Sequence, residues 1–119
     1  LANVAPTYRP FVDGAFVDGG GEALKTVNPA TEEVLAEVGT ASEQDVDRAV
    51  AAARRAFEKP WGPMPGAERA KYLYRIARIV AERSRELAVL ETLDNGKPIR
   101  ESRDVDVPTA SAHLFHHAG

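Results

Sequence analysis

The sequence contains no cysteine, which excludes disulfides, thiolate metal ligands and a cysteine nucleophile within these 119 residues. It also lacks any run of about 18 apolar residues, so no transmembrane helix is predicted. The net charge is only -3, and such a balance gives no reason to expect nucleic acid or a membrane surface as a partner. The first ten residues lack the basic and apolar regions of a secretory signal, and we expect a cytoplasmic protein.

Motifs that hold phosphate groups are missing as well. Neither G-x-G-x-x-G nor G-x-x-x-x-G-K-[ST] occurs, so no phosphate-binding loop is predicted. The one glycine cluster, Gly19–Gly21, precedes no strong helix start and is predicted to be a turn. The composition that remains, 44% hydrophobic and 28% charged residues, is typical of at most one soluble globular domain.

The N-terminal segment is predicted to contain a hairpin. Residues 1–8 are interpreted as a flexible lead-in. Phe11-Val12 and Phe16-Val17 are short apolar pairs on either side of Asp13-Gly14, a pair that favours a tight turn. This pattern predicts a hairpin within residues 9–21.

Two more extended segments are predicted before the helices begin. Residues 26–31 are expected to run from an extended segment into a turn, because Pro29 biases Asn28 towards extended geometry. Residues 33–38 alternate in polarity and predict a further strand.

The rest of the chain is predicted to be helical. Ser42 followed by Asp45 resembles a capping box and predicts a helix over about 43–58. Three prolines within residues 59–66 exclude a helix interior there. Further helices are predicted over 67–82, from a cap at Ser84 to near Asp94, and from Pro98 to Ala118, where Pro108 delays the regular part to about Asp106.

The predicted helices carry apolar stripes. The inward faces are expected to be Val46, Ala49, Val50, Ala53 and Phe57 in the first helix and Leu73, Ile76, Ala77 and Val80 in the second. The sequence predicts no large sheet for these stripes to cover. This mismatch favours a fragment or an obligate assembly.

The most distinctive segment is residues 90–98, which reads Leu-Glu-Thr-Leu-Asp-Asn-Gly-Lys-Pro. Asn95-Gly96 supplies residues that tolerate positive φ, as a helix C-cap needs, and Pro98 prevents simple continuation. Asp94 stands at the negative end of the helix dipole, which disfavours a carboxylate. We expect it to have a partner, namely Lys97, a backbone donor or a cation. The alternative is an ordinary surface carboxylate.

Three histidines lie close together near the C-terminus of the sequence. His113, His116 and His117 have the spacing that brings imidazoles to one face of a helix, which is compatible with metal binding. No neighbouring acid completes a site. The alternative is that they occupy partly buried or interface positions.

Several segments, in order, resemble the aldehyde dehydrogenase superfamily. Thr-Val-Asn-Pro-Ala-Thr at residues 26–31 and the segment at residues 90–98 are specific in combination, and their spacing also matches. The other matching segments are Phe11–Gly14 with Phe16-Val17, residues 45–53, residues 67–69 and Ala118-Gly119. The resemblance implies an α/β family fold in which residues 1–119 form the N-terminal part of the coenzyme-binding domain, mostly helical, with a small antiparallel hairpin and a short extra strand.

The resemblance implies an enzyme that oxidises an aldehyde to a carboxylic acid with NAD or NADP. In this family a cysteine attacks the aldehyde, hydride passes to the nicotinamide, and a glutamate activates water. These groups, the coenzyme-binding βαβ units and the oligomerisation parts lie beyond Gly119 in relatives, which are commonly homodimers or homotetramers. No catalytic or cofactor-binding residue is therefore assigned here, and Asn28, Asn95 and Glu91 are not the catalytic Asn and Glu.

One family feature does map onto these residues. Many relatives bind a structural cation through two backbone carbonyls and a carboxylate, and the matching residues are Thr26, Val27 and Asp94. Oxygen-only ligation suits a hard cation. In some relatives the helix that contains Thr109 lies near the substrate entrance. Relatives usually carry aromatic residues where this chain has His116-His117.

Two functions from different classes follow. The first is the N-terminal portion of an NAD(P)-dependent aldehyde dehydrogenase that is inactive as an isolated chain. The alternative is a non-catalytic helical module that self-associates, or regulates a full-length relative, through exposed apolar faces.

Overall fold

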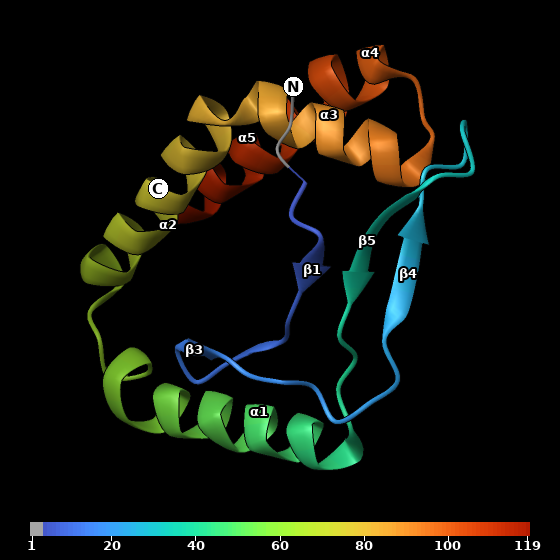
Figure 1. Cartoon of the computed structure of the whole chain (residues 1–119). Coiled ribbons are helices and arrows are strands. Elements are labelled where there is room, and N and C mark those ends of the chain that lie inside the picture. The colour runs from blue at the N-terminus through green and yellow to red at the C-terminus, as the bar shows by residue number, and fades with distance from the viewer. Residues whose placement is uncertain (1–3) are drawn as a thin grey trace. The chain divides into compact units, whose positions relative to one another are not determined.

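The computed structural model describes residues 4–119, which fall into two compact units. The strand unit comprises residues 4–27 and 33–63, and the helical unit comprises residues 28–32 and 64–119. Figure 1 follows the chain by colour, from blue strands to green, yellow and red helices. Helices account for 59% of the structure, which confirms the predicted mostly helical segment with a few short strands.

The strand unit contains a three-stranded sheet in the order β1-β5-β4. Its strands are β1 (Thr7–Tyr8), β4 (Leu24–Val27) and β5 (Val34–Val38). β1 pairs with β5 in parallel, and β4 pairs with β5 antiparallel. The extended segment predicted at residues 26–31 and the strand predicted at 33–38 are both confirmed, and Ala36 in β5 is buried.

Strand β1 corrects the prediction of a flexible lead-in. The Gly39 amide donates to the carbonyl of Tyr8 at 2.9 Å, and the Glu37 amide donates to that of Pro6 at 3.0 Å. This pairing depends on a partner about 30 residues away, so local sequence patterns do not report it. Residues 1–3 of the predicted lead-in lie outside the described residues.

The predicted hairpin is confirmed. It consists of β2 (Phe11–Val12) and β3 (Ala15–Phe16), paired antiparallel. Asp13 and Gly14 have φ values of 52° and 83°, which is the backbone of the favoured two-residue hairpin turn. The Phe11 and Phe16 rings pack edge to face with centroids 5.1 Å apart.

Helix α1 (Glu43–Ala56) begins with the predicted capping box of Ser42 and Asp45. Its predicted inward face is wrong for four of its five residues, because Ala53 is exposed together with the three larger side chains. Val46, Val50 and Phe57 are 52–59% exposed, whereas Asp45 and Ala52 are buried. Small side chains let the hairpin approach closely, so the hairpin packs on the alanine side of the helix, and a shallow groove there is lined by β2, its turn and Ala49, Ala52, Ala53 and Ala56.

The proline-rich stretch after α1 starts with a helical turn, contrary to the prediction. A π-helical turn, η1 (Phe57–Trp61), contains Pro60, and the Gly62 amide donates to the Phe57 carbonyl at 2.7 Å. A π-turn is wider than an α-turn, and it accommodates a residue that has no N–H and whose ring clashes with the preceding turn. The predicted break is thus displaced to the residues after Gly62.

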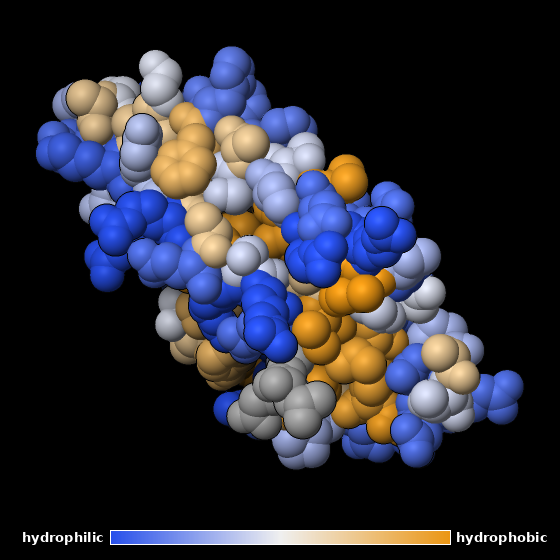
Figure 2. Space-filling view, turned by 90° about the horizontal axis from the view of Figure 1, so that it is seen from above, coloured by the Kyte–Doolittle hydropathy of each residue, from blue (hydrophilic) through white to orange (hydrophobic). Residues whose placement is uncertain are grey.

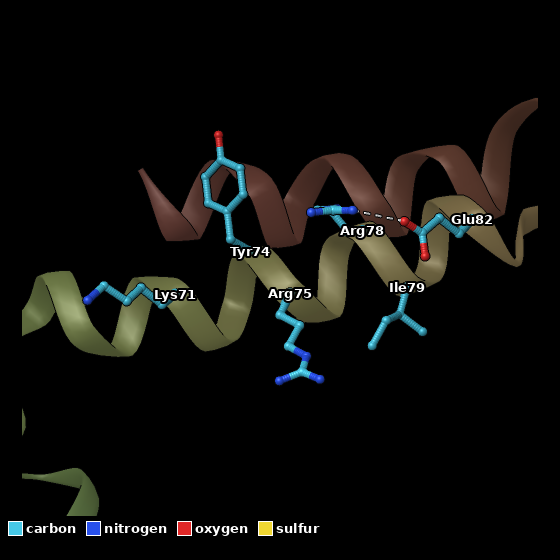
Figure 3. Close-up of a pocket in the computed structure, with 6 residues that line it drawn as sticks. All are labelled: Lys71, Tyr74, Arg75, Arg78, Ile79 and Glu82. Carbon is cyan, nitrogen blue, oxygen red and sulfur yellow. Dashed lines mark hydrogen bonds and ion pairs between the residues drawn. The ribbon is translucent and has the colours of Figure 1, made fainter.

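The helical unit is built from α2 (Gly66–Glu82), α3 (Ser84–Asn95), α4 (Ile99–Glu101), the π-turn η2 (Ser102–Asp106) and α5 (Val107–Ala118). Helices α2 and α5 lie side by side (Figures 1 and 3). Ala77 at their contact is fully buried, and the Ser111 hydroxyl donates to its carbonyl at 3.1 Å. The regular helix after Pro98 starts at Val107, one residue from the predicted start.

Two details of the helical unit differ from prediction. Ser84 does not cap α3, because Arg83 is the N-cap and makes no side-chain capping bond. Hydrogen bonds run from the Arg83 amide back to Ile79 and from the Leu87 amide to the Arg83 carbonyl, so α2 and α3 nearly join and a serine cap has little to satisfy. Ile76 was predicted to face inward but is 47% exposed.

The core consists of small residues. Among the described residues the buried apolar side chains are Ala36, Ala52, Ala77, Ala88 and Val107. Larger apolar side chains from β2, β3, α1 and α2 are exposed, and Figure 2 shows apolar side chains (orange) gathered at the surface beside charged ones (blue). Apolar stripes without a large sheet to cover were expected from the sequence. None of the described helices is long and apolar enough to span a membrane.

Candidate functional site

The end of α3 has the predicted C-cap geometry. Gly96 adopts φ 80° and ψ 4°, and its amide donates to the Thr92 carbonyl at 2.9 Å. A Cβ atom at this position would lie 2.5 Å from Cγ of Pro29. The turn of residues 28–32 therefore packs directly against the glycine of the segment at residues 90–98. The two most distinctive motifs of the sequence meet here, within the helical unit.

Asn28 organises the turn that meets Gly96. Its side chain is 9% exposed, and its Oδ1 accepts a hydrogen bond from the Ala30 amide at 2.9 Å. Its carbonyl accepts from the Glu32 amide at 2.8 Å, and Glu32 takes a left-handed backbone with φ 62°. These bonds are those of a self-contained turn. The geometry therefore gives Asn28 a structural role.

Lys97 is not the partner of Asp94. It forms an ion pair with Asp106, where both side chains are about one-third exposed, and this hydrogen bond raises the pKa of Lys97. The chain reverses at Gly96, and Lys97 thereby reaches η2 instead of the end of α3. The side chain of Asp94 is exposed, and its carboxylate makes no hydrogen bond or ion pair with another residue of the described part. Its carboxylate oxygens are available to a ligand.

Thr26 and Val27 end β4, the strand at one edge of the three-stranded sheet. The register with β5 shifts between these two residues. A bulge at a sheet edge leaves backbone groups outside the regular ladder. The two residues belong to the strand unit and Asp94 to the helical unit. That the three residues share a cation stays a prediction. No group of three or more His, Asp or Glu within residues 4–119 is arranged to hold a metal.

The N-terminus of α1 already holds an anion. The carboxylate of Asp45, 3% exposed, accepts hydrogen bonds at 2.8 Å from the Gly20 amide and from the amide and hydroxyl of Ser42. Arg48 pairs with its other oxygen. The hydrogen bond from Gly20, followed by those from Ser42 and Arg48, holds the pKa of Asp45 well below its usual range.

This arrangement does not fit a dinucleotide. A helix N-terminus binds phosphate through free amides, whereas here the Ser42 hydroxyl accepts from the Asp45 amide and the negative charge of the Asp45 carboxylate beside the cap repels an anion. The glycine cluster thus forms a loop that is hydrogen-bonded to α1 through Gly20 and Asp45, which agrees with its prediction as a turn. The sheet order β1-β5-β4 also contains no βαβ unit of the kind that binds dinucleotides. Neither the N-terminus of α1 nor this three-stranded sheet therefore has the geometry of a dinucleotide-binding cradle.

The histidine cluster lies on the outer face of α5. Ser111, Leu114, Phe115 and Ala118 are the buried or half-buried residues of this helix end, and all three histidines are exposed. Of the alternative positions expected for them, partial burial is therefore wrong, and an interface position stays a prediction. The His116 and His117 rings contact each other edge to face at 5.2 Å. Thr109, in the first turn of the same helix, is exposed too.

A groove along α2 was not anticipated from the sequence (Figure 3). One broad face of α2 lines it, with Lys71, Tyr74, Arg75, Arg78, Ile79 and Glu82. Arg78 pairs with Glu82 at 3.2 Å, and Lys71 pairs with Glu68 at 2.7 Å. These residues recur at intervals of three and four positions, which indicates one face of a helix. The sequence-based prediction considered only the apolar residues of this helix and therefore did not include the groove.

Comparison with known proteins identifies the family. The family model described as "Aldehyde dehydrogenase family" matches residues 16–119, a span that contains both motifs that meet at Gly96. The chain belongs to the aldehyde dehydrogenase family. Among relatives of this aldehyde dehydrogenase chain, the putative aldehyde dehydrogenase DhaS of Bacillus subtilis is 44% identical over 115 residues, and the aminoacetaldehyde dehydrogenase of Pseudomonas aeruginosa is 47% identical over 112 residues.

Solved aldehyde dehydrogenases share the fold of the chain. An aldehyde dehydrogenase from Bacillus cereus, solved as an NAD+ complex, is 48% identical and superposes with a TM-score of 0.87 over 92% of this chain. The two curated relatives are matched over 95% and 92% of this chain. In all three comparisons the chain spans only 23% of the other protein's length. It corresponds to an N-terminal segment of these enzymes.

Proposed function

We propose that the chain forms the N-terminal part of the coenzyme-binding domain of an NAD-dependent enzyme that oxidises an aldehyde to a carboxylic acid. The observation that carries this proposal is the match to the Bacillus cereus aldehyde dehydrogenase, whose structure holds NAD+. NADP is the alternative coenzyme. The proposal includes a cytoplasmic enzyme that assembles as a homodimer or homotetramer. In this proposal residues 1–119 help to hold the coenzyme-binding domain in place and do not themselves take part in the oxidation of the aldehyde.

The assay of this proposal compares the chain with the complete protein that contains it. The isolated chain is expected to give no aldehyde-dependent reduction of NAD or NADP, because it contains no nucleophilic cysteine. The complete protein is expected to reduce NAD when an aldehyde is added. Absorbance of the reduced coenzyme measures both. Turnover by the isolated chain, or an inactive but folded complete protein across an aldehyde panel, would contradict the proposal.

A second candidate function rests on the exposed apolar surface. Val50, Phe57 and Ile76 are 47–59% exposed, while the buried apolar side chains within residues 4–119 are four alanines and one valine. Surfaces of this kind mark interaction sites. They favour a non-catalytic helical module that self-associates or binds a full-length relative.

We also propose that Thr26, Val27 and Asp94 bind a structural cation through two carbonyls and a carboxylate. The support is the unpartnered carboxylate of Asp94 and the edge position of Thr26 and Val27 at a register shift. A hard cation such as Na+, K+, Mg2+ or Ca2+ suits oxygen ligands, and further sequence or water supplies the remaining ones. A cation also offsets the unfavourable position of Asp94 at the end of α3.

Thermal unfolding in different salts tests this cation site. The melting temperature is expected to be higher in one of these cations than in tetramethylammonium at equal ionic strength. Asp94→Asn is expected to remove that difference, since a neutral amide ligates more weakly. Asp47→Asn is the matched control, because Asp47 is also exposed and helical and has no partner in the described part. The same cation dependence in Asp94→Asn and in the unchanged chain would contradict the site.

A further inference from the structure

Asn95 and Gly96, at the end of α3, form the only Asn-Gly pair in the sequence. An asparagine that precedes glycine is chemically labile, because a residue without a Cβ atom leaves its backbone nitrogen open to the neighbouring side chain. The other two asparagines have different neighbours. Asn3 precedes valine, and Asn28 precedes Pro29, which has no backbone N–H. The sequence therefore singles out Asn95 for spontaneous deamidation.

Deamidation at this pair needs only two groups of the chain and water. The backbone nitrogen of Gly96 attacks Cγ of Asn95, so that a bond forms between these two atoms and the bond from Cγ to Nδ2 breaks. Nδ2 leaves as ammonia and carries away the proton of the Gly96 amide. Water then opens the resulting five-membered imide at either of its carbonyl carbons. The product is an aspartate or an isoaspartate at position 95, and no electrons are exchanged.

The structure leaves one of the two reacting groups free and restrains the other. The Asn95 side chain is exposed and makes no hydrogen bond with another of the described residues. The Gly96 amide, in contrast, donates to the Thr92 carbonyl at 2.9 Å. A hydrogen-bonded N–H gives up its proton less readily, and the ring cannot close while Asn95 keeps a helical ψ of about −42°. The C-cap bond of Gly96 therefore opposes the reaction.

Two contacts keep this C-cap closed, one on each side of the attacking nitrogen. Pro29 packs against Gly96, where its Cγ lies 2.5 Å from the position of an added Cβ atom. The next residue, Lys97, forms an ion pair with Asp106 in η2. The last turn of α3 cannot unwind without weakening one of these contacts. Local opening of the cap is thus a distinct step that precedes the chemistry.

We propose that Asn95 is a deamidation site and that opening of the α3 C-cap controls its rate. The folded chain protects Asn95, and each opening of the cap exposes it to attack by Gly96. The change is not neutral, because either product places a second carboxylate beside Asp94 at the negative end of the helix dipole. An isoaspartate also adds a methylene group to the backbone directly before Gly96. The inference concerns chemical ageing of the chain and does not depend on dehydrogenase activity.

Timed incubation of the 119-residue chain tests the proposal, with peptide mapping by mass spectrometry and chromatographic separation of the isoaspartate product. One sample stays in buffer, where circular dichroism reports the fold, and the other is unfolded in guanidinium chloride. Deamidation of Asn95 is expected to be at least about tenfold slower in buffer, because only the open cap reacts. Asn28 is the internal control and should stay unchanged in both samples, since Pro29 offers no attacking N–H.

A variant beside the cap separates control by the fold from the chemistry of the pair itself. Lys97→Gln removes the ion pair with Asp106 and is expected to accelerate deamidation about threefold in buffer, with no change in guanidinium chloride. Lys71→Gln is the matched control, because it removes an ion pair with Glu68 on α2 and should leave the rate unchanged. If Lys97→Gln loses its helical signal, Asp106→Asn removes the same ion pair and takes its place.

Three results would overturn the proposal. The first is an equal rate of Asn95 deamidation in buffer and in guanidinium chloride, which would show that the cap gives no protection. The second is a folded Lys97→Gln or Asp106→Asn variant that reacts no faster than the unchanged chain. The third is conversion of Asn28 as fast as that of Asn95, because the reaction would then not need the amide of the following residue.

Discussion

Gly96→Ala is expected to destabilise the helical unit by about 2–4 kcal/mol. Gly96 holds φ 80°, a backbone conformation that costs any residue with a Cβ atom. The added methyl group would also lie 2.5 Å from Cγ of Pro29, so the turn of residues 28–32 has to move. Urea denaturation followed by circular dichroism measures the loss. Because this contact joins the two most distinctive motifs, it is the position in the helical unit where one methyl group should matter most.

Gly14→Ala is the matched control for this substitution. Gly14 has nearly the same φ, 83°, but a Cβ atom there meets nothing within 4 Å. It should lose only the backbone cost of about 1 kcal/mol. The difference between the two variants then isolates the contact with Pro29. Equal losses at the two glycines would show that the turn yields freely and that the contact contributes nothing.

Asp45→Ala is expected to lower the melting temperature by more than about 5 °C. The substitution leaves the amides of Gly20 and Ser42 without their acceptor and Arg48 without its partner. These bonds are part-buried, and a donor that loses its acceptor in such a place costs more than the bond itself contributes. The change removes the Asp45 half of the capping box of α1, while Ser42 remains the N-cap, and it releases the glycine loop. Thermal unfolding measures the effect. Asp47→Ala, in the same first turns of α1, is the control and should leave the melting temperature nearly unchanged, because the Asp47 side chain is exposed and without a partner in the described part.

The same carboxylate should make stability depend on acid. Its pKa in the folded chain lies well below the ordinary value of about 3.9 that it recovers on unfolding. The unfolded chain therefore binds more protons as pH falls, so the stabilisation is complete above about pH 5 and declines towards and below pH 4. Asp45→Asn should show a shallower decline over that range than the unchanged chain. Parallel pH profiles for the two proteins would contradict this role of Asp45.

Features specified by neighbouring residues were predictable from the sequence. The turn at Asp13-Gly14, the capping box of Ser42 and Asp45, and the C-cap at Gly96 were all placed correctly. Each depends on backbone preferences or hydrogen bonds that span at most four residues. Such features require no knowledge of what packs against them.

Several predictions that depended on distant contacts failed. The face of α1 was assigned by hydrophobicity, yet the hairpin packs beside its alanines, of which Ala52 is buried, and Val50 is exposed. Lys97 was one of three partners expected for Asp94, the others being a backbone donor and a cation, but the reversal at Gly96 carries Lys97 to Asp106. The π-turn that contains Pro60 was not predicted, because proline was considered only as a residue that ends α-helices.

The sequence by itself indicated the family, the order of the strands and helices apart from β1 and the π-turns, and the caps at Ser42 and Gly96, because motifs and short-range preferences are written in consecutive residues. Only the tertiary structure decided which of those elements touch. The packing of Pro29 on Gly96, the hydrogen bond between Gly20 and Asp45, and the groove along α2 each join residues that are distant in sequence or aligned only on a folded helix. These contacts depend on side-chain volume, charge and direction in three dimensions, which no local pattern of residues reports.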